Sequence, residues 1–336
     1  MIKHNQPTLG TKEIKAAKRV ITSGWVLDGN EVKNFEEELA EYFQITSGGV
    51  VCFSSGSTAL YVALMILQDI ESVHLPIYTC SAVSQAVRLS RKKIIFLDNE
   101  KESPNAAYSK EMIDRKQTAI IVDTFGRAAK IDHELLGSNS IEDISQAFGA
   151  SANNALLGRR TKIGVGSLSA TKIITSGGQG GFLILQDSRM LKIAEDFRNF
   201  DGRHDKNFRF NFKMTEIQAA IGRVQLSRVS EFIEKRESLY SKYCALGVPL
   251  LESQNSGDIP YRAILKVRNP KYVLSQLESR GVRGIIPYRA EEFQSDPDNF
   301  KNAKKFAKSI ISLPIYPSLT IHQVSKISSL IRDLLK

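Results

Sequence analysis

Short apolar segments alternate with helical segments over the first half of the chain, and this alternation limits the fold more than any other feature. Clear helical patterns cover residues 56–67 and 81–89 between the strands. The predicted strands are 50–53, 73–75, 93–97, 119–123, 140–144, 165–168 and 181–185. Buried strands connected through helices are typical of a mostly parallel sheet with helices on both faces. The sequence therefore predicts an α/β fold in which ligands bind at the carboxyl ends of the strands.

The two ends of the chain differ from this alternating region. Two helices are predicted before the first strand, and one long helical region is predicted from Thr215 to about residue 244. Beyond Pro249 the predicted elements are strands at 261–267 and 282–286 and helices at 270–280, 299–309 and 320–335. We therefore predict a large domain over residues 1–235, which includes the N-terminal helices, and a smaller C-terminal α+β domain over residues 236–336.

The apolar and cysteine patterns indicate a protein of the cytoplasm. No apolar run approaches the roughly 20 residues that span a bilayer, and the first residues lack the apolar core of a signal peptide. The three cysteines, Cys52, Cys80 and Cys244, are scattered and odd in number, which argues against a disulfide framework. We expect a reducing compartment and no association with membranes.

The chain is basic, with a formal net charge of +10. Its lysines and arginines are spread along the sequence, whereas nucleic-acid-binding proteins tend to concentrate them on one element. The charge therefore favours solvated faces and an attraction for small anions, including phosphorylated ligands, over nucleic-acid binding. The five histidines are also dispersed and show no spacing that is typical of a metal site.

Residues 54–60 join a predicted strand to a helix and have the sequence SSGSTAL. Free backbone amides at a helix N-terminus, together with small residues and hydroxyls, can hold a phosphate group. Serine and threonine are also ordinary helix caps, and the segment alone does not decide between the two interpretations. It is not a Walker loop, because no Gly-Lys-Ser/Thr follows at the required spacing.

Lys172 and Asp143 follow two of the predicted strands, and Lys172 precedes the glycine-rich segment 176–181. A lysine amine can form an imine with the aldehyde of pyridoxal 5′-phosphate (PLP), and a buried carboxylate can keep the pyridine nitrogen protonated. Gln146 could reach the phenolic oxygen of that cofactor. Acidic residues at strand ends are common in turns, and it is the combination with Lys172 that gives Asp143 a specific task.

Residues 207–220 contain polar and aromatic side chains and lead into the long helical region. They are either an ordinary loop before a helix or a loop that delivers Asn211 to a site on a neighbouring subunit. The sequence pattern does not choose between these two interpretations.

Motifs along nearly the whole chain resemble the DegT/DnrJ/EryC1/StrS family of PLP-dependent sugar aminotransferases. They are GWVLDGNEVKNFE at 24–36, SGSTAL at 55–60, EDISQAFG at 142–149, TK at 171–172, GG at 180–181, FNFKMTEIQAA at 210–220 and SLPIYPSLT at 312–320. Each motif is weak alone, and together, in this order and spacing, they are specific. The resemblance implies PLP-dependent transferase fold type I, and a homodimer with its two active sites at the interface.

The resemblance also implies a role for each site residue. The residues expected to bind the cofactor are Gly56, Ser57, Thr58, Cys80, Asp143, Gln146, Ser167, Lys172 and Asn211. Lys172 would be the catalytic residue and carry the cofactor as an imine, and Asp143 would pair with the pyridine nitrogen. The segment 56–58 would hold the phosphate together with Ser167, and Asn211 would reach the cofactor phosphate of the partner subunit. Cys80 stands where the family usually has an aromatic residue that stacks on the cofactor, so the cofactor ring would lose this partner unless Tyr78 or another group substitutes for it.

The activity implied is transfer of an amino group from an amino acid, expected to be glutamate, to a keto sugar carried on a nucleotide. Such a reaction supplies amino sugars for cell-surface glycans or secondary metabolites. The chain departs from the family at Cys80, at Lys162 and Gln179, where acidic residues are frequent, and in a shorter C-terminal half. Cys80 and the shorter C-terminal half motivate an alternative, a PLP-binding homologue with weakened catalysis and a regulatory or assembly role.

Overall fold

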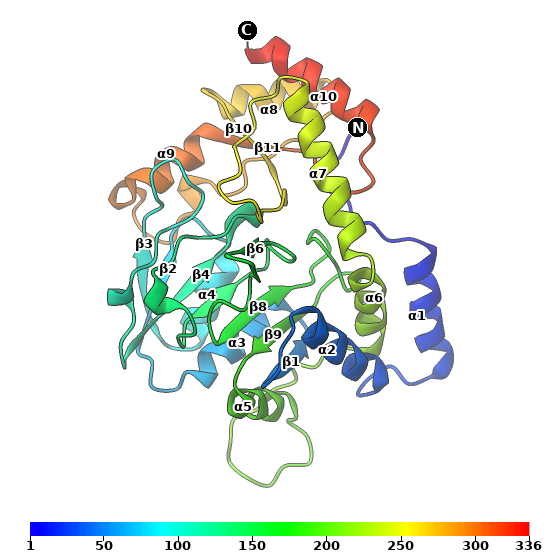
Figure 1. Ribbon diagram of the computed structural model, residues 1–336, viewed down its shortest axis with the longest axis vertical. Coiled ribbons are helices and arrows are strands. Elements are labelled where there is room, and N and C mark those ends of the chain that lie inside the picture. The colour runs from blue at the N-terminus through cyan, green and yellow to red at the C-terminus, as the bar shows by residue number, and fades with distance from the viewer. Residues whose placement is uncertain (336) are drawn as a thin grey trace.

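A computed structural model describes residues 1–335 and contains a central seven-stranded sheet with helices on both faces (Figure 1). Its strands are β1 (Gly49–Phe53), β2 (Ser72–Pro76), β3 (Lys93–Leu97), β4 (Gln117–Val122), β5 (Ile141–Asp143), β8 (Ile163–Ser167) and β9 (Gly181–Leu185). Their order in the sheet is β1-β9-β8-β5-β4-β2-β3. Only β9 runs antiparallel to its neighbours, so the prediction of a mostly parallel sheet is confirmed.

Ten α-helices are present among the described residues. They are α1 (Thr11–Ser23), α2 (Asn30–Tyr42), α3 (Gly56–Ile66), α4 (Ser81–Leu89), α5 (Ser188–Arg198), α6 (Glu216–Leu226), α7 (Val229–Ala245), α8 (Pro270–Ser279), α9 (Lys301–Ser309) and α10 (Ile321–Leu335). None of these helices is both long enough and apolar enough to cross a membrane.

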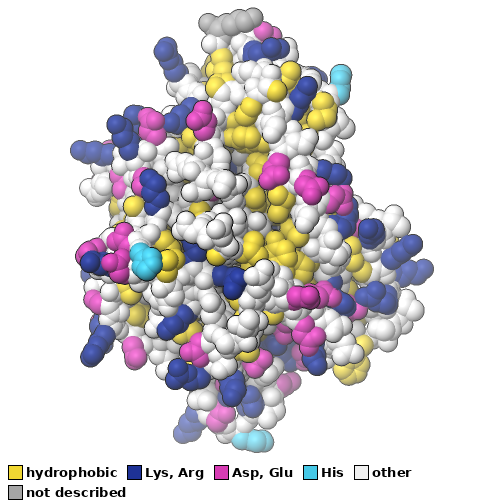
Figure 2. All heavy atoms as spheres, viewed as in Figure 1, with side chains coloured by type: hydrophobic (Ala, Val, Ile, Leu, Met, Phe, Trp, Pro, Cys, Tyr) yellow, Lys and Arg dark blue, Asp and Glu magenta, His cyan; other side chains and the backbone are white. Residues whose placement is uncertain are grey.

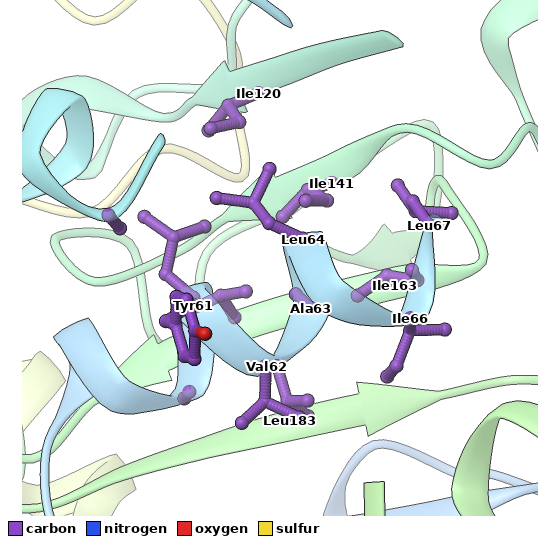
Figure 3. Packing of buried hydrophobic residues seen from close by; sticks show 14 of the residues in the cluster. Tyr61, Val62, Ala63, Leu64, Ile66, Leu67, Ile120, Ile141, Ile163 and Leu183 are labelled. Atoms are coloured by element: carbon purple, nitrogen blue, oxygen red, sulfur yellow. The ribbon is translucent and has the colours of Figure 1, made fainter. Parts of the chain in front are cut away.

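The sheet is buried on both faces because successive strand residues are apolar. In β9, Leu183 and Leu185 face the layer that contains α3, α4 and α5, while Phe182 and Ile184 face the layer that contains α2 and α6. Helix α3 is apolar on nearly all sides and packs its side chains against the sheet residues Ile120, Ile141, Ile163 and Leu183 (Figure 3). Since buried apolar area is the main stabilising term in folding, this packing fixes α3 firmly over the centre of the sheet.

A separate apolar cluster lies in the C-terminal part of the chain. Here β10 (Ala263–Lys266) and β11 (Ile310–Leu313) form a two-stranded antiparallel sheet that packs with α7, α8 and α10. Ile2 joins the same cluster, and its backbone bonds to Gly281 and Arg283, so the N-terminus lies beside the C-terminal part in Figure 1. The boundary at residue 235 stays a prediction.

The long helical region predicted from Thr215 to about residue 244 is present, but Ser227 and Arg228 divide it into α6 and α7. Helix α6 packs on α1 and α2, whereas the far end of α7 packs in the C-terminal cluster. The break between them lets each helix pack against its own apolar cluster. The strand predicted at 282–286 is absent from the described residues. Single bridges from Val282 and Ile285 are formed there instead.

Lysine and arginine side chains are mixed with aspartate and glutamate over the face shown in Figure 2. Exposed ion pairs among the described residues include Lys116 with Glu71 and Lys235 with Glu231. On this face the basic residues therefore do not gather into one continuous positive stripe.

Candidate active site

A cavity of about 320 Å³ lies at the carboxyl ends of the parallel strands. Of the predicted site residues, Gly56, Ser57, Cys80, Asp143, Gln146, Ser167 and Lys172 line it. They come from the segments that follow β1, β2, β5 and β8, which end at the same edge of the sheet. Thr58 and Asn211 do not line this cavity. The topology of the sheet thus brings together most of the residues that the sequence singled out.

Helix α3 begins at the cavity. Its N-cap residue Ser55 accepts a hydrogen bond from the amide of Thr58 at 3.1 Å, and the Thr58 hydroxyl donates to the Ser55 carbonyl at 2.7 Å. Thr58 therefore serves as part of the helix cap. The first-turn amides of Gly56 and Ser57 have no acceptor within the helix, because no preceding turn exists. These two residues line the cavity, and so the start of α3 offers N–H donors and the positive end of the helix dipole there.

Glycine is required where α3 approaches the sheet. A Cβ at Gly56 would lie 2.9 Å from Cβ of Ser167, and one at Gly181 would lie 2.4 Å from the nitrogen of Gly56. Real Cβ atoms essentially never show such distances, so a side chain at either position would force its neighbours to shift. The two glycines thus let the ends of β8 and β9 and the start of α3 meet closely, which leaves room for an anion beside Ser167.

Lys172 lies in the loop between β8 and β9, and this loop is folded back on itself. The amide of Lys172 donates to the carbonyl of Ser169 at 3.0 Å, and Ser169 pairs with Gly178. The Lys172 amine lies 5.8 Å from the centre of the Tyr261 ring and makes no ion pair with a carboxylate of residues 1–335. A lysine in a cavity without a fixed anionic partner is available to a ligand.

Asp143 ends β5 and is only 6% exposed. One of its oxygens accepts a hydrogen bond from the amide of Ser145 at 2.9 Å. Burial raises the pKa of Asp143, while the Ser145 hydrogen bonds and the charge of Lys172 act in the opposite direction. A buried carboxyl group that lines a cavity and has no ion pair among the described residues suits a ligand that presents a cationic or N–H group to it.

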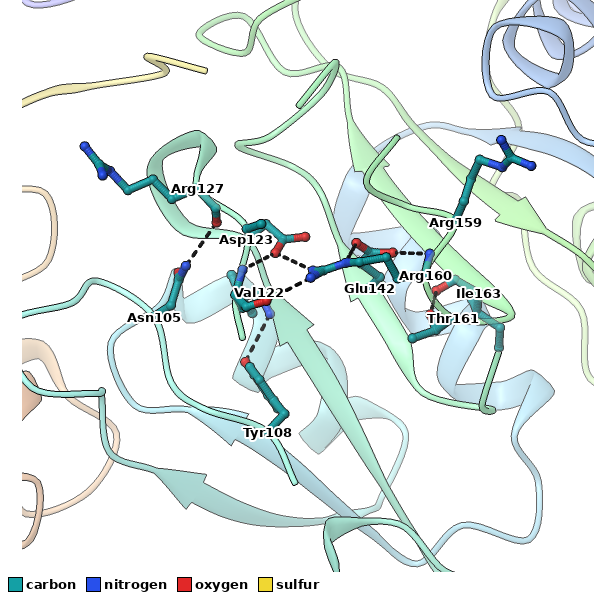
Figure 4. Close-up of polar contacts among 12 residues, drawn as sticks. Asn105, Tyr108, Val122, Asp123, Arg127, Glu142, Arg159, Arg160, Thr161 and Ile163 are labelled. Atoms are coloured by element: carbon teal, nitrogen blue, oxygen red, sulfur yellow. Dashed lines mark hydrogen bonds and ion pairs between the residues drawn. The ribbon is translucent and has the colours of Figure 1, made fainter. Parts of the chain in front are cut away.

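The neighbouring Glu142 does not line the cavity, and its contact with Arg160 gives it a structural role (Figure 4). The Arg160 guanidinium lies 2.6 Å from both Glu142 and Asp123, and it also donates to the carbonyl of Ala129 at 2.8 Å. Both carboxylates are fully buried. This network joins the ends of β4 and β5 beside the cavity, and it explains why Glu142 does not take part in the site.

Gln146 is held within the wall of the cavity. Its carbonyl oxygen accepts from the amide of Phe125 at 3.2 Å, and its amide nitrogen donates to the hydroxyl of Tyr288 at 2.5 Å. Tyr288 lines the cavity, whereas Tyr78 is fully buried and packs edge-on against Tyr288 with ring centres 5.1 Å apart. Tyr78 is thus not available as a stacking partner in the cavity, and Cys80 is exposed at its edge.

The C-terminal part of the chain supplies one wall of the cavity, which the sequence did not predict. Tyr261, Arg262 and Tyr288 line the cavity together with Lys172. Burial tends to raise the pKa of Tyr261, but the positive charges of Lys172, Arg262 and Arg236 outweigh it, and the net pKa is lowered. No local pattern distinguishes these residues, because their place depends on how the C-terminal part packs on the sheet.

Asn211 lies in the exposed segment between α5 and α6, which extends away from the body of the molecule in Figure 1. Phe208 and Phe210 in the same segment are each 57% exposed. Phe212 anchors the segment by packing edge-on against Tyr61, with ring centres 5.8 Å apart. Asn211 is therefore positioned at the surface, outside the cavity of its own chain.

Comparison with known proteins gives a consistent result. The model of the DegT/DnrJ/EryC1/StrS aminotransferase family matches residues 7–332. The GDP-perosamine synthase of Escherichia coli O157:H7 is 28% identical over 254 residues, which cover 71% of this chain and 69% of that protein. The dTDP-3-amino-3,4,6-trideoxy-alpha-D-glucose transaminase of Streptomyces venezuelae is 24% identical over 346 residues, which cover 95% of this chain and 90% of that protein.

Solved structures show the same fold. The aminotransferase TlmJ from Streptoalloteichus hindustanus superposes with a TM-score of 0.88 at 21% identity, over 100% of this chain and 99% of that one. The PLP form of Spr1654 from Streptococcus pneumoniae superposes with a TM-score of 0.87 at 18% identity, over 99% of both chains. The predicted fold type is thereby confirmed, and the chain belongs to the DegT/DnrJ/EryC1/StrS aminotransferase family.

Proposed function

We propose that this protein is a PLP-dependent aminotransferase that moves an amino group from an amino acid, with glutamate as the expected donor, onto a keto sugar carried on a nucleotide. One observation carries the proposal: Lys172, Asp143 and the N-terminus of α3 line a single cavity. The named activities of the relatives in Escherichia coli and Streptomyces venezuelae support the choice of acceptor.

The residues of the cavity fit the cofactor in three respects. The first turn of α3, with Ser167, would hold the phosphate through N–H and hydroxyl donors. Asp143 is a buried carboxyl group with no ion pair among the described residues, which suits a protonated ring nitrogen. Lys172 has an amine that is free to bond covalently. Gln146 is already engaged by Phe125 and Tyr288, and we propose that it acts by orienting Tyr288.

PLP, when bound, would supply an electron-withdrawing ring system for carbon–nitrogen chemistry. Asp143 would keep the proton on the ring nitrogen, because a buried carboxylate gains from a close positive partner. The amine of Lys172, once released from the cofactor, would take the proton from the amino-bearing carbon as a general base and deliver it, as a general acid, to the carbon of the cofactor that had carried the aldehyde. Tyr261 beside it would limit the motion of this amine and help to exclude water.

We further propose a homodimer in which Asn211 completes the site of the partner subunit. Trp25 is 63% exposed, and the adjacent Leu27 pairs with Thr215. Phe208 and Phe210, in the segment that leads to Thr215, are each 57% exposed. Exposed apolar side chains of this kind are typical of protein–protein interfaces. The three free cysteines support the cytoplasm as the compartment.

The alternative of a homologue with weakened catalysis is not favoured. Lys172 and Asp143 both line the cavity, and Tyr288 contributes an aromatic ring to the lining of the same cavity as Cys80. The loss of the usual aromatic residue at Cys80 is therefore not by itself a loss of the site.

Measuring the two half-reactions of the aminotransferase separately tests the proposal. The PLP-loaded protein should form 2-oxoglutarate from glutamate, and the resulting amino form should then react with one member of a panel of dTDP-, GDP- and UDP-linked keto sugars. Lys172→Ala should abolish both halves, whereas Lys192→Ala, at an exposed lysine of α5, should leave them unchanged. If the unaltered, PLP-loaded protein reacts with none of the amino acids tried, the proposal is refuted.

The shared site has its own test. A protein that carries Asn211→Ala and one that carries Lys172→Ala should each be inactive, and mixed dimers should regain activity. Sedimentation should show monomers for the double variant Phe208→Ser/Phe210→Ser and dimers for Tyr272→Ser, an exposed residue of α8. Mixed dimers without activity would contradict the role of Asn211.

A further inference from the structure

Arg262 is the charged residue of the cavity that the proposed chemistry does not use. It lies directly before β10 and lines the cavity together with Lys172. Its guanidinium is 5.3 Å from the centre of the Tyr261 ring and 5.8 Å from that of Phe125. Its Nε is buried without a hydrogen-bond partner, and no carboxylate among residues 1–335 forms an ion pair with it. A guanidinium in this state has donors available for a ligand.

The surroundings of Arg262 carry positive charge that is not compensated. Arg236 is almost fully buried, and it donates to the carbonyl oxygens of Tyr261 at 3.2 Å and Ile315 at 3.0 Å. Among the described residues, Asp143 is the only acidic one that lines the cavity, and its charge is assigned to the cofactor. This side of the cavity therefore attracts an anion.

His4 fixes the position of the Arg262 guanidinium. Nε2 of His4 lies 3.4 Å from Nη1 of Arg262 and 2.9 Å from the hydroxyl of Ser312. Because a guanidinium can only donate, Nε2 must be the acceptor, and His4 is then neutral with its proton on Nδ1. A neutral histidine adds no charge to the cavity wall, so the charge of Arg262 stays available.

The segment around His4 also contacts the lysine loop. The amide nitrogen of the Asn5 side chain donates to the carbonyl of Thr171 at 3.1 Å, directly before Lys172. The backbone of Ile2 bonds to the C-terminal part at Gly281 and Arg283. The N-terminal segment thus connects the wall that carries Arg262 to the loop that carries Lys172.

We propose that Arg262 binds an oxyanion of the substrate and that His4 is the residue that positions it. The planar guanidinium presents paired N–H donors, which match a carboxylate or a phosphate oxygen pair. Both Arg262 and Lys172 lie against Tyr261, so the bound oxyanion would lie close to the reacting amine. This inference rests on the proposed function for the identity of the substrate, whose oxyanion belongs either to the amino donor or to the nucleotide sugar.

Calorimetry on the PLP-saturated protein tests the inference with two unreactive probes, succinate for a carboxylate and inorganic pyrophosphate for the diphosphate. Arg262→Met should raise the dissociation constant of one probe by about 10- to 100-fold, as expected for loss of a charge-assisted hydrogen bond. The probe that is affected identifies the source of the oxyanion. Unchanged binding of both probes would overturn the proposal.

The role of His4 needs variants that separate positioning from packing. His4→Phe and His4→Leu remove the acceptor for Arg262 and should weaken the same probe by about 3- to 10-fold. His4→Gln retains a carbonyl oxygen as acceptor and should bind within about 2-fold of the unaltered protein. His322→Phe, at an exposed histidine of α10, is the control. Equal binding by all four variants, or equal loss in His4→Gln and His4→Phe, would overturn the positioning role.

A kinetic comparison distinguishes failure of this inference from failure of the proposed function. If succinate is the affected probe, His4→Phe should raise the KM for glutamate and change kcat little. If pyrophosphate is affected, the KM for the sugar nucleotide should rise instead. A protein that binds a probe through Arg262 but converts no amino donor would refute the proposed function and leave the oxyanion site standing.

Discussion

Gly181→Ala is expected to damage the cofactor site through backbone packing alone. A Cβ at this position would lie 2.4 Å from the nitrogen of Gly56, 2.4 Å from the carbonyl carbon of Ser55 and 2.5 Å from the Cα of Gly56. Ordinary contacts begin near 3.4 Å, so the start of α3 must move by about 1 Å. All three obstacles are backbone atoms, and no side-chain rotation can relieve the overlap.

Two effects should follow from this displacement. Overpacking of a close contact typically costs about 1–3 kcal/mol of the free energy of unfolding. The amides of Gly56 and Ser57 would also move relative to Ser167, so PLP should bind about 10-fold more weakly or worse. Urea unfolding of the cofactor-free protein measures the first effect, and a fluorescence titration with PLP measures the second.

Gly178→Ala is the matched control. A Cβ at Gly178 meets no atom within 4 Å, so stability should change by less than about 0.5 kcal/mol and PLP affinity should stay the same. Equal PLP affinity of Gly181→Ala and Gly178→Ala would refute the reasoning that the close approach of α3 to β9 forms the phosphate site.

Three further predictions concern other parts of the structure. Arg160→Met should reduce the free energy of unfolding in urea by about 3–5 kcal/mol, because Asp123 and Glu142 would stay buried without their cation; a loss below about 1 kcal/mol would contradict this. Burial and the nearby charge of Arg262 lower the pKa of His4 to about 3. The contribution of neutral His4 to the free energy of unfolding is therefore fully present above its ordinary pKa of about 6.5. As the pH falls toward 3, the unfolded chain binds a proton that the folded protein does not, and the protein should lose on the order of 1 kcal/mol of unfolding free energy per pH unit relative to His4→Gln. Parallel pH profiles of the two proteins would contradict this. Cys80→Phe should tighten PLP binding by about 2- to 10-fold in the titration, since a ring at the cavity edge can stack on the cofactor; unchanged or weaker binding would speak against stacking there.

The parts of the fold that the sequence predicted well are those set by local patterns. Continuous apolar runs identified the strands, and the topology of a parallel sheet then placed Asp143, Ser167 and Lys172 at one edge. The cap residue Thr58 was harder to assign, because a hydroxyl in a helix-start motif suits a cap and a phosphate equally well.

The features that the sequence did not predict depend on tertiary packing. Both sides of Ser227 and Arg228 are good helix formers, and the bend between α6 and α7 is set by the two separate cores that these helices join. Arg262 and His4 lie 258 residues apart in the chain, and only the packing of the N-terminal segment on β10 and β11 brings them together. Neither residue belongs to a motif that sequence spacing could reveal.

The most direct test of the proposed function is whether PLP becomes attached to Lys172. Reduction of the PLP-loaded protein with borohydride, followed by peptide mapping in a mass spectrometer, locates any lysine that holds the cofactor covalently. The modified peptide should contain Lys172, and prior incubation with glutamate should prevent the modification. Attachment at a different lysine, or no attachment after saturation with PLP, would contradict the role assigned to Lys172.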